Sequence, residues 1–182
     1  MVTKENTGGS RYHEGKPVSH SIELPVSANK QELYQELALQ LGGLLTGEHD
    51  PIANAANMAS LMYHTLPDVS WVGFYFLKEG ELVLGPFHGK PACVRIALGR
   101  GVCGTAAEAR QSVVVPDVFA FPGHIACDTA SRSELVVPLV RQNVLVGVLD
   151  LDSPLPGRFD EADRVGCESL AAIYLAASQE GL

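Results

Sequence analysis

Positive charge and long hydrophobic runs are both scarce in this sequence of 182 residues. It carries 13 Lys and Arg against 21 Asp and Glu, so its net charge is −8. A surface of this sign repels nucleic-acid phosphates and anionic lipid headgroups, which argues against both as partners. No apolar run approaches the roughly 20 residues of a transmembrane helix, and residues 1–20 lack the apolar segment of a secretory signal. We therefore expect a cytoplasmic protein that binds neither nucleic acid nor membranes.

Closely spaced cysteine pairs are also missing. The four cysteines are Cys93, Cys103, Cys127 and Cys167, and no two of them have the CxxC spacing of structural zinc sites. The sequence therefore predicts no metal. Because cytoplasmic thiols are kept reduced, permanent structural disulfides are not expected either. Two interpretations of the cysteines remain, namely burial as small apolar side chains and redox chemistry.

Polar residues dominate the first 27 positions, and the apolar pattern of a folded domain starts after them. We expect a polar tail over 1–27 and one domain over 28–182, which is long enough to bury a core. The periodicities predict an α+β fold, with a mainly antiparallel central sheet flanked by N-terminal and C-terminal helices. The expected helices cover 29–45, 51–66, 101–109 and a final segment capped by Asp160, and the expected strands cover 69–77, 81–86, 92–98, 113–115, 134–141 and 144–152.

Three acidic side chains are predicted to meet at one end of the sheet. Alternation along the last strand puts Asp150 and Asp152 on the face of Val146 and Val148. A tight turn returns the chain antiparallel, so Glu134 on the preceding strand comes close to them. The group is either a set of solvated strand-end charges or a pocket for a cationic group or a proton donor. In a pocket, mutual repulsion lets at least one carboxyl keep its proton to a higher pH.

The predicted loop over 117–132 is long for a compact domain, and loops of this length are often lids or binding loops. Cys127 lies in it between a histidine and an aspartate, which makes it a candidate reactive cysteine. Cys103 is expected at a helix N-terminus, where the helix dipole favours a thiolate. For Cys93 and Cys103 the alternative is burial in the core, and for Cys167, in the middle of an apolar helix, burial is the favoured interpretation.

Trp71 and Tyr75 share one face of a predicted strand. Core packing is the usual reason for such a pair, and the alternative is the apolar wall of a small-ligand pocket. The glycine-rich segment 99–104 lacks the Lys-Ser/Thr ending of a phosphate-binding loop, so we interpret it as a tight turn before a helix.

Six short motifs along the chain carry a further signal. They are Trp71–Tyr75 (WVGFY), Leu84–Phe87 (LGPF), Gly89–Cys93 (GKPAC), Gly99–Gly104 (GRGVCG), Phe121–Asp128 (FPGHIACD) and Gly147–Ser153 (GVLDLDS). In this order, with three of the four cysteines among them, they closely resemble the free methionine-(R)-sulfoxide reductases, a family of single-domain GAF-fold enzymes. The resemblance runs from about Gln31 to the C-terminus.

The resemblance implies a role for each matching residue. Cys127 matches the nucleophile, Cys93 the resolving cysteine, and Cys103 a third cysteine that can serve as an alternative disulfide partner. The implied substrate-binding residues are Glu134, Asp150, Asp152, Trp71 and Tyr75. Asp152 is also counted with the catalytic residues, and which carboxylate donates the proton stays open.

The activity implied by the resemblance is reduction of free methionine-(R)-sulfoxide, with thioredoxin as the reductant and no cofactor. A homodimer through the N-terminal and C-terminal helices is implied as well. Two alternatives remain: a GAF sensor that binds a small ligand without turnover, and a thiol redox sensor. For the first, an acidic pocket suits a phosphate ligand such as a cyclic nucleotide poorly.

Overall fold

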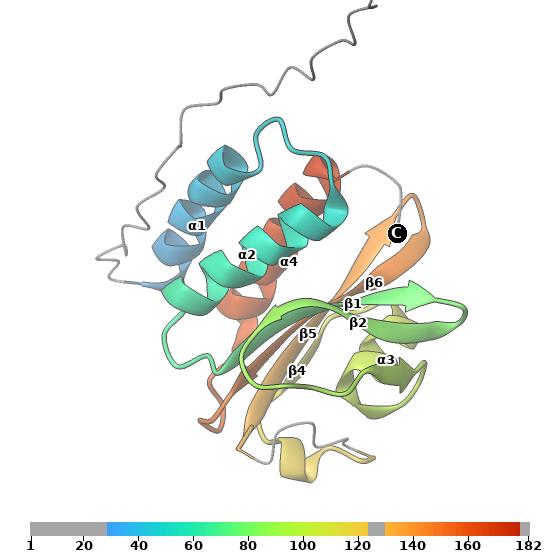
Figure 1. Cartoon of the computed structure of the whole chain (residues 1–182). Coiled ribbons are helices and arrows are strands. Elements are labelled where there is room, and N and C mark those ends of the chain that lie inside the picture. Colours follow the sequence, from blue (N-terminus) through green and yellow to red (C-terminus); the bar gives the residue numbers. More distant parts are fainter. Residues whose placement is uncertain (1–28, 124–129, 179–182) are drawn as a thin grey trace, which may run out of the picture.

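The computed structural model describes residues 29–123 and 130–178, which form one six-stranded sheet and its covering helices (Figure 1). The helices are α1 (Lys30–Leu44), α2 (Pro51–Thr65), α3 (Gly101–Ala109) and α4 (Glu161–Ala177), with a short 3₁₀ turn at Val118–Ala120. The strands are β1 (Trp71–Lys78), β2 (Glu81–His88), β3 (Arg95–Ala97), β4 (Val113–Val115), β5 (Ser133–Arg141) and β6 (Val144–Ser153). The predicted tail over 1–27 lies outside the described residues.

The strand order is β3-β2-β1-β6-β5-β4, and each neighbouring pair is antiparallel. Helices α1, α2 and α4 form a layer on one face of this sheet, while α3 packs on the other (Figure 1). This confirms the predicted α+β fold with an antiparallel sheet flanked by N-terminal and C-terminal helices. The two central strands, β1 and β6, therefore have a covered surface on each face.

Polar side chains cap the N-termini of α1, α2 and α4, and the cap at Asp160 is the one predicted above. The side chains of Asn29, Asp50 and Asp160 each accept a hydrogen bond from a backbone N–H in the first turn. Such a bond satisfies one of the N–H groups that a helix start leaves without a partner in the helix. Asp160 and Asp163 also complete a reciprocal capping box.

The turn between β5 and β6 has the geometry that a tight hairpin requires. Gln142 and Asn143 have φ values of 48° and 65°, and two left-handed residues match the twist of the flanking strands. The predicted third strand is longer than the observed one. Only Arg95–Ala97 pairs, because β3 is an edge strand that contacts only one end of β2.

One predicted face assignment is wrong. A register shift pairs Leu139 with Gly147 but Val140 with Leu145, so Val146 is an extra residue in β6. Such a bulge reverses the alternation of side chains before it. Val146 therefore packs against the helical layer, whereas Val148 lies on the opposite face with Asp150 and Asp152.

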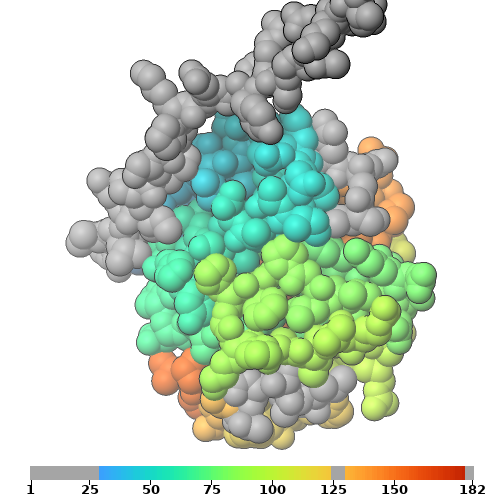
Figure 2. Space-filling model, viewed as in Figure 1, coloured from blue at the N-terminus to red at the C-terminus, as the bar shows by residue number. Residues whose placement is uncertain are grey.

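Two separate hydrophobic clusters result, one on each side of the sheet. The larger lies under α1, α2 and α4 and includes Phe74, Leu149 and Tyr174, and the smaller lies between the sheet and α3 and includes Trp71, Tyr75 and Val148. In the space-filling view the blue to cyan residues of α1 and α2 lie above the green residues that follow them in the chain (Figure 2). Within the described ranges, no helix combines the length and hydrophobicity needed to cross a membrane.

Candidate active site

The strand register brings the three predicted carboxylates together on the α3 side of the sheet. Glu134 on β5 pairs directly with Asp152 on β6, and Asp150 lies two positions further along the same strand. Glu134 and Asp150 are each only 6 % exposed, while Asp152 is half-buried. The prediction that these groups meet is confirmed, and the interpretation as solvated strand-end charges does not hold for the two buried ones.

Burial keeps protons on this group. It is the main reason that the pKa of Asp150 lies well above its ordinary value, and the neighbouring charge of Asp152 adds to the effect. Burial, followed by the charges of Asp150 and Asp152, likewise raises the pKa of Glu134 well above its usual range. The two buried carboxyls therefore keep a proton to a higher pH than exposed carboxyls would. Oδ1 of Asp150 has no hydrogen-bond partner among the described residues.

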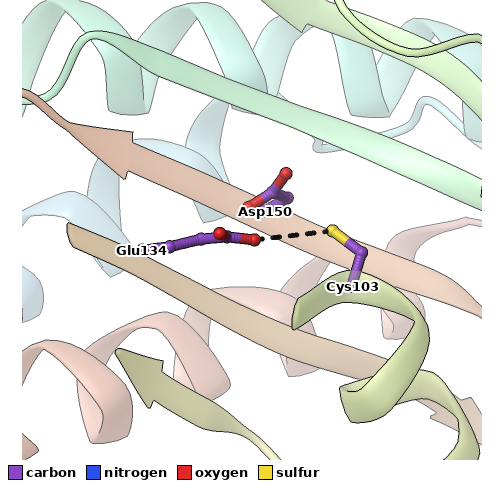
Figure 3. A group of neighbouring side chains, drawn as sticks. All are labelled: Cys103, Glu134 and Asp150. Atoms are coloured by element: carbon purple, nitrogen blue, oxygen red, sulfur yellow. Dashed lines mark hydrogen bonds between the residues drawn. The ribbon is translucent and has the colours of Figure 1, made fainter. Parts of the chain in front are cut away.

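The thiol of Cys103 on α3 faces the carboxyl groups of Glu134 and Asp150 (Figure 3). Its Sγ lies 3.9 Å from Oε1 of Glu134, and the sulfur and carboxylate oxygens of Cys103, Glu134 and Asp150 all lie within 4.8 Å of one another. Burial, and then the charges of Asp150 and Glu134, raise the pKa of this thiol well above its ordinary value. The predicted stabilisation of a thiolate by the helix dipole is therefore wrong for Cys103, because desolvation and two adjacent acids outweigh it.

A close backbone approach sets the position of α3. A Cβ at Gly104 would lie 2.3 Å from the carbonyl oxygen of Ala97, so only glycine lets the helix pack this near β3. The neighbouring Cys103 is thereby held over the acidic end of β5 and β6. The glycine-rich segment is a tight turn before a helix, as predicted.

Trp71 and Tyr75 form the aromatic wall of this site. Their ring centroids lie 6.0 Å apart, and Phe87 stacks on the other side of the indole at 5.4 Å. Nε1 of Trp71 donates a hydrogen bond to the carbonyl oxygen of Lys90 at 3.0 Å, which fixes the ring. A Cβ at Gly73 would lie 2.3 Å from the indole, so the glycine makes room for it. Both interpretations of the pair hold at once, since the rings are buried and also line a pocket.

These groups line one pocket with an empty volume of about 550 Å³, including its open mouth. Three further polar residues line it that the sequence did not single out: Lys90, Arg100 and Ser131. Lys90 and Arg100 are exposed and bring positive charge to an otherwise acidic site. Their position just before two of the matched cysteines was the signal that could have identified them.

The four cysteines differ in bonding and in location. Cys93 is disulfide-bonded, whereas Cys103 and Cys167 are free thiols. Cys127 lies outside the described residues, and its predicted place at the site stays a prediction. Cys167 is fully buried beneath α1 and donates a hydrogen bond to Tyr34, as expected for a core residue.

Comparison with known proteins finds relatives that share this fold. Residues 56–177 match the model of the GAF domain family. The chain is 51 % identical to a free methionine-R-sulfoxide reductase of Escherichia coli, covering 79 % of this chain and 87 % of that protein. It superimposes with a TM-score of 0.83 on a Neisseria meningitidis free methionine-R-sulfoxide reductase solved with its substrate, at 43 % identity, covering 87 % of this chain and 95 % of that one. A Burkholderia vietnamiensis structure described as a GAF sensor protein matches at 58 % identity and a TM-score of 0.81, covering 83 % and 96 %.

Proposed function

This chain belongs to the free methionine-R-sulfoxide reductase family, built on a GAF domain, and we propose that it reduces free L-methionine-(R)-sulfoxide to methionine. The observation that carries the proposal is the pocket itself. Two buried carboxyls, a half-buried one and a fixed indole face one small space. That arrangement is complementary to a zwitterion with an apolar, sulfur-containing side chain.

The carboxylates explain why a free amino acid would be preferred. An α-ammonium group can donate charge-assisted hydrogen bonds to Glu134, Asp150 or Asp152. Oδ1 of Asp150 is buried and accepts no hydrogen bond from the described residues, so it can accept one from the ammonium. A methionine inside a peptide has an amide in place of the ammonium. It would leave buried acidic groups without a cationic partner, which is costly, so the pocket discriminates against it.

The remaining two parts of the substrate have complementary partners as well. The substrate carboxylate would lie toward Lys90 and Arg100, the positive residues of the pocket lining. The methyl and sulfur end would pack against the indole of Trp71. Three contact types at three positions fix the orientation of the sulfoxide.

The reaction then needs a thiolate and an acid. We propose that the thiolate of Cys127 attacks the sulfoxide sulfur while a protonated carboxyl of the cluster delivers a proton to the departing oxygen. A bond forms between the sulfur of Cys127 and the substrate sulfur, the S–O bond breaks, and the protonated oxygen leaves as hydroxide. Hydroxide then attacks the sulfur of Cys127 and the S–S bond breaks. Methionine leaves with the electron pair on sulfur, and Cys127 becomes a sulfenic acid. The raised pKa values of Glu134 and Asp150 support this role, because burial keeps a proton on these carboxyls to a higher pH than solvent exposure would.

A second thiol completes the turnover. The sulfenic acid of Cys127 condenses with the thiol of Cys93, releasing water and forming a disulfide. The disulfide recorded at Cys93 supports this role. A low-potential dithiol such as thioredoxin, present in the cytoplasm where we expect the protein, would restore both thiols.

An assay that couples NADPH oxidation to thioredoxin tests this function. We expect continuous NADPH consumption with free methionine-(R)-sulfoxide, and none above background with the (S) epimer or with an N-acetylated, amidated (R)-sulfoxide. Cys127→Ser is expected to abolish turnover, because no thiolate remains to attack the sulfur. A Cys167→Ser variant is the matched control and should keep the wild-type rate.

The same assay separates the two sensor alternatives. A thiol redox sensor would consume about one equivalent of oxidant per chain and then stop. A ligand-binding sensor would show no sulfoxide-dependent consumption at all. Either result would contradict the reductase proposal.

We also propose that two chains associate through α1 and α4. A groove between these helices is lined by Ala38 and Val165, and Leu39 and Val165 are 73 % and 49 % exposed. Light scattering after size exclusion is expected to give twice the chain mass. A monomeric mass for the wild type would contradict this assembly.

A further inference from the structure

Cys103, Glu134 and Asp150 bring three potential metal ligands to one point from three separate elements. Figure 3 shows the thiol of α3 directed at the carboxylates of β5 and β6. One sulfur and one oxygen from each carboxylate lie within 4.8 Å of one another, and all three residues are buried. A tetrahedral ion with bonds of about 2.0–2.3 Å holds its ligand atoms about 3.3–3.6 Å apart. Side-chain rotations that move the three ligand atoms by about 1 Å would therefore bring them to coordination distance.

An unused acceptor in the same group points to a missing positive partner. Oδ1 of Asp150 is buried and has no hydrogen-bond partner among the described residues. A buried polar atom without a partner costs free energy, and natural proteins keep few of them. The atom lies in the pocket lining, where a ligand can reach it.

We propose that Cys103, Glu134 and Asp150 form a binding site for one thiophilic divalent cation of the Zn²⁺ type. The donor set selects the ion, because Mg²⁺ and Ca²⁺ require oxygen ligands alone, whereas Zn²⁺ and Cd²⁺ accept a thiolate together with carboxylates. Coordination releases to solvent the thiol proton of Cys103 and any proton held by Glu134 or Asp150. The pocket leaves a fourth position open to water.

The site goes beyond the proposed reductase activity and does not depend on it. It does predict a consequence for that activity, since the cation would occupy the carboxylates that the substrate ammonium needs. Zn²⁺ would therefore compete with free methionine sulfoxide. The sequence analysis predicted no metal, and it missed this site because the ligands come from positions 103, 134 and 150 and have no short spacing.

Metal titration of a variant without redox thiols tests the site separately from catalysis. The full-length, tag-free chain with Cys93→Ser and Cys127→Ser is stripped with a chelator and titrated with Cd²⁺, whose bond to a thiolate gives an ultraviolet charge-transfer band. We expect one Cd²⁺ per chain with that band, and Zn²⁺ should displace it. In the same background, Cys103→Ser should remove the band and weaken Zn²⁺ binding in calorimetry at least tenfold.

Matched controls decide the assignment. Cys167→Ser in the same background should bind Cd²⁺ as tightly as its parent, whereas Glu134→Gln should bind at least tenfold more weakly. The proposal fails if no band forms, or if Zn²⁺ affinity survives Cys103→Ser, as it would for an ion held by the neighbouring rings of His64 and His88. Saturating methionine-(R)-sulfoxide should raise the apparent Kd for Cd²⁺ at least tenfold. Tight Cd²⁺ binding whose affinity does not change with the sulfoxide would contradict the proposed function and still support the metal site.

Discussion

Asp163 and Asp150 are both buried carboxylates, but they differ in what surrounds them. Asp163 on α4 is fully buried, and both of its oxygens have partners. Oδ1 accepts from Tyr34 at 2.9 Å and from Arg158 at 3.0 Å, while Oδ2 accepts from Lys30 and from the backbone N–H of Asp160. Two cations and two hydrogen-bond donors therefore balance one negative charge in the helical layer.

Asp150 on the opposite side of the sheet has the reverse surroundings. Its neighbours are a thiol and two more acids, its Oδ1 has no partner among the described residues, and burial raises its pKa. The hydrogen-bond partners of a buried carboxylate indicate whether its role is structural or ligand-binding. The satisfied one ties α1 to α4 and can be understood without a ligand, whereas the unsatisfied one is explained by something that binds there.

Removing the satisfied carboxylate should have the largest effect on stability. Asp163→Asn leaves the buried Arg158 without its counter-charge, while Lys30 keeps its ion pair with Asp160. The loss of one partner of a buried ion pair costs about 3–5 kcal/mol. Denaturant unfolding at neutral pH should show that loss. The activity per folded molecule should stay within about twofold of wild type, because the pocket lies across the sheet. Unchanged stability would mean that the network contributes nothing net.

Removing the unsatisfied carboxylate should have the opposite sign. Asp150→Asn is expected to lower kcat/KM at least tenfold, since the amide can neither pair with an ammonium nor deliver a proton. At pH 7.5 its thermal midpoint should be higher than that of wild type, because ionisation of this carboxyl stabilises the unfolded wild-type chain and an amide does not ionise. Glu134→Gln and Asp152→Asn should also lose at least tenfold in kcat/KM, and wild-type rates in these variants would contradict the acidic pocket.

The pH dependence of that stability difference follows from the raised pKa of Asp150. Below the unfolded-state pKa of about 3.9, both states hold the proton and the carboxyl costs nothing extra. Above it the unfolded chain ionises while the folded protein keeps its proton, so wild-type stability falls by about 1.4 kcal/mol per pH unit until the folded pKa is reached. The advantage of Asp150→Asn should therefore grow as the pH rises from about 4 until the folded pKa is reached. A constant difference across that range would refute the raised pKa.

Much of this site is predictable from local sequence rules. Alternation within β6 puts Asp150 and Asp152 on one face, and the tight turn at Gln142 and Asn143 sets the register that brings Glu134 opposite Asp152. Both rules act over a few residues, which is why they succeed. The bulge at Val146 broke the same alternation further from the site, since nothing in the local pattern marks an extra residue.

The position of the Cys103 thiol beside the acidic residues could not be predicted from the residues next to it in the sequence. The helix dipole acts over one turn and predicts a reactive thiolate, but the packing of α3 on the sheet puts the sulfur beside Glu134. That placement depends on Gly104 meeting the carbonyl of Ala97 and on the pairing of β5 with β6, which are long-range events. The pocket residues Lys90 and Arg100 were missed for a different reason, because their position within two of the matched motifs was not used.

The aromatic residues of β1 offer the finest test of the difference between the two faces, with the smallest expected effect. Trp71→Phe keeps an apolar ring in the pocket but loses the hydrogen bond from Nε1 to Lys90, a contribution of about 0.5–1.5 kcal/mol. The looser ring should raise KM for methionine-(R)-sulfoxide about two- to tenfold and leave kcat nearly unchanged. Phe74→Leu is the control on the opposite face, where the ring packs on Tyr174 at 4.8 Å. It should lower the thermal midpoint without changing KM, because no atom of Phe74 lines the pocket. If both variants raised KM equally, the two faces would not be functionally separate.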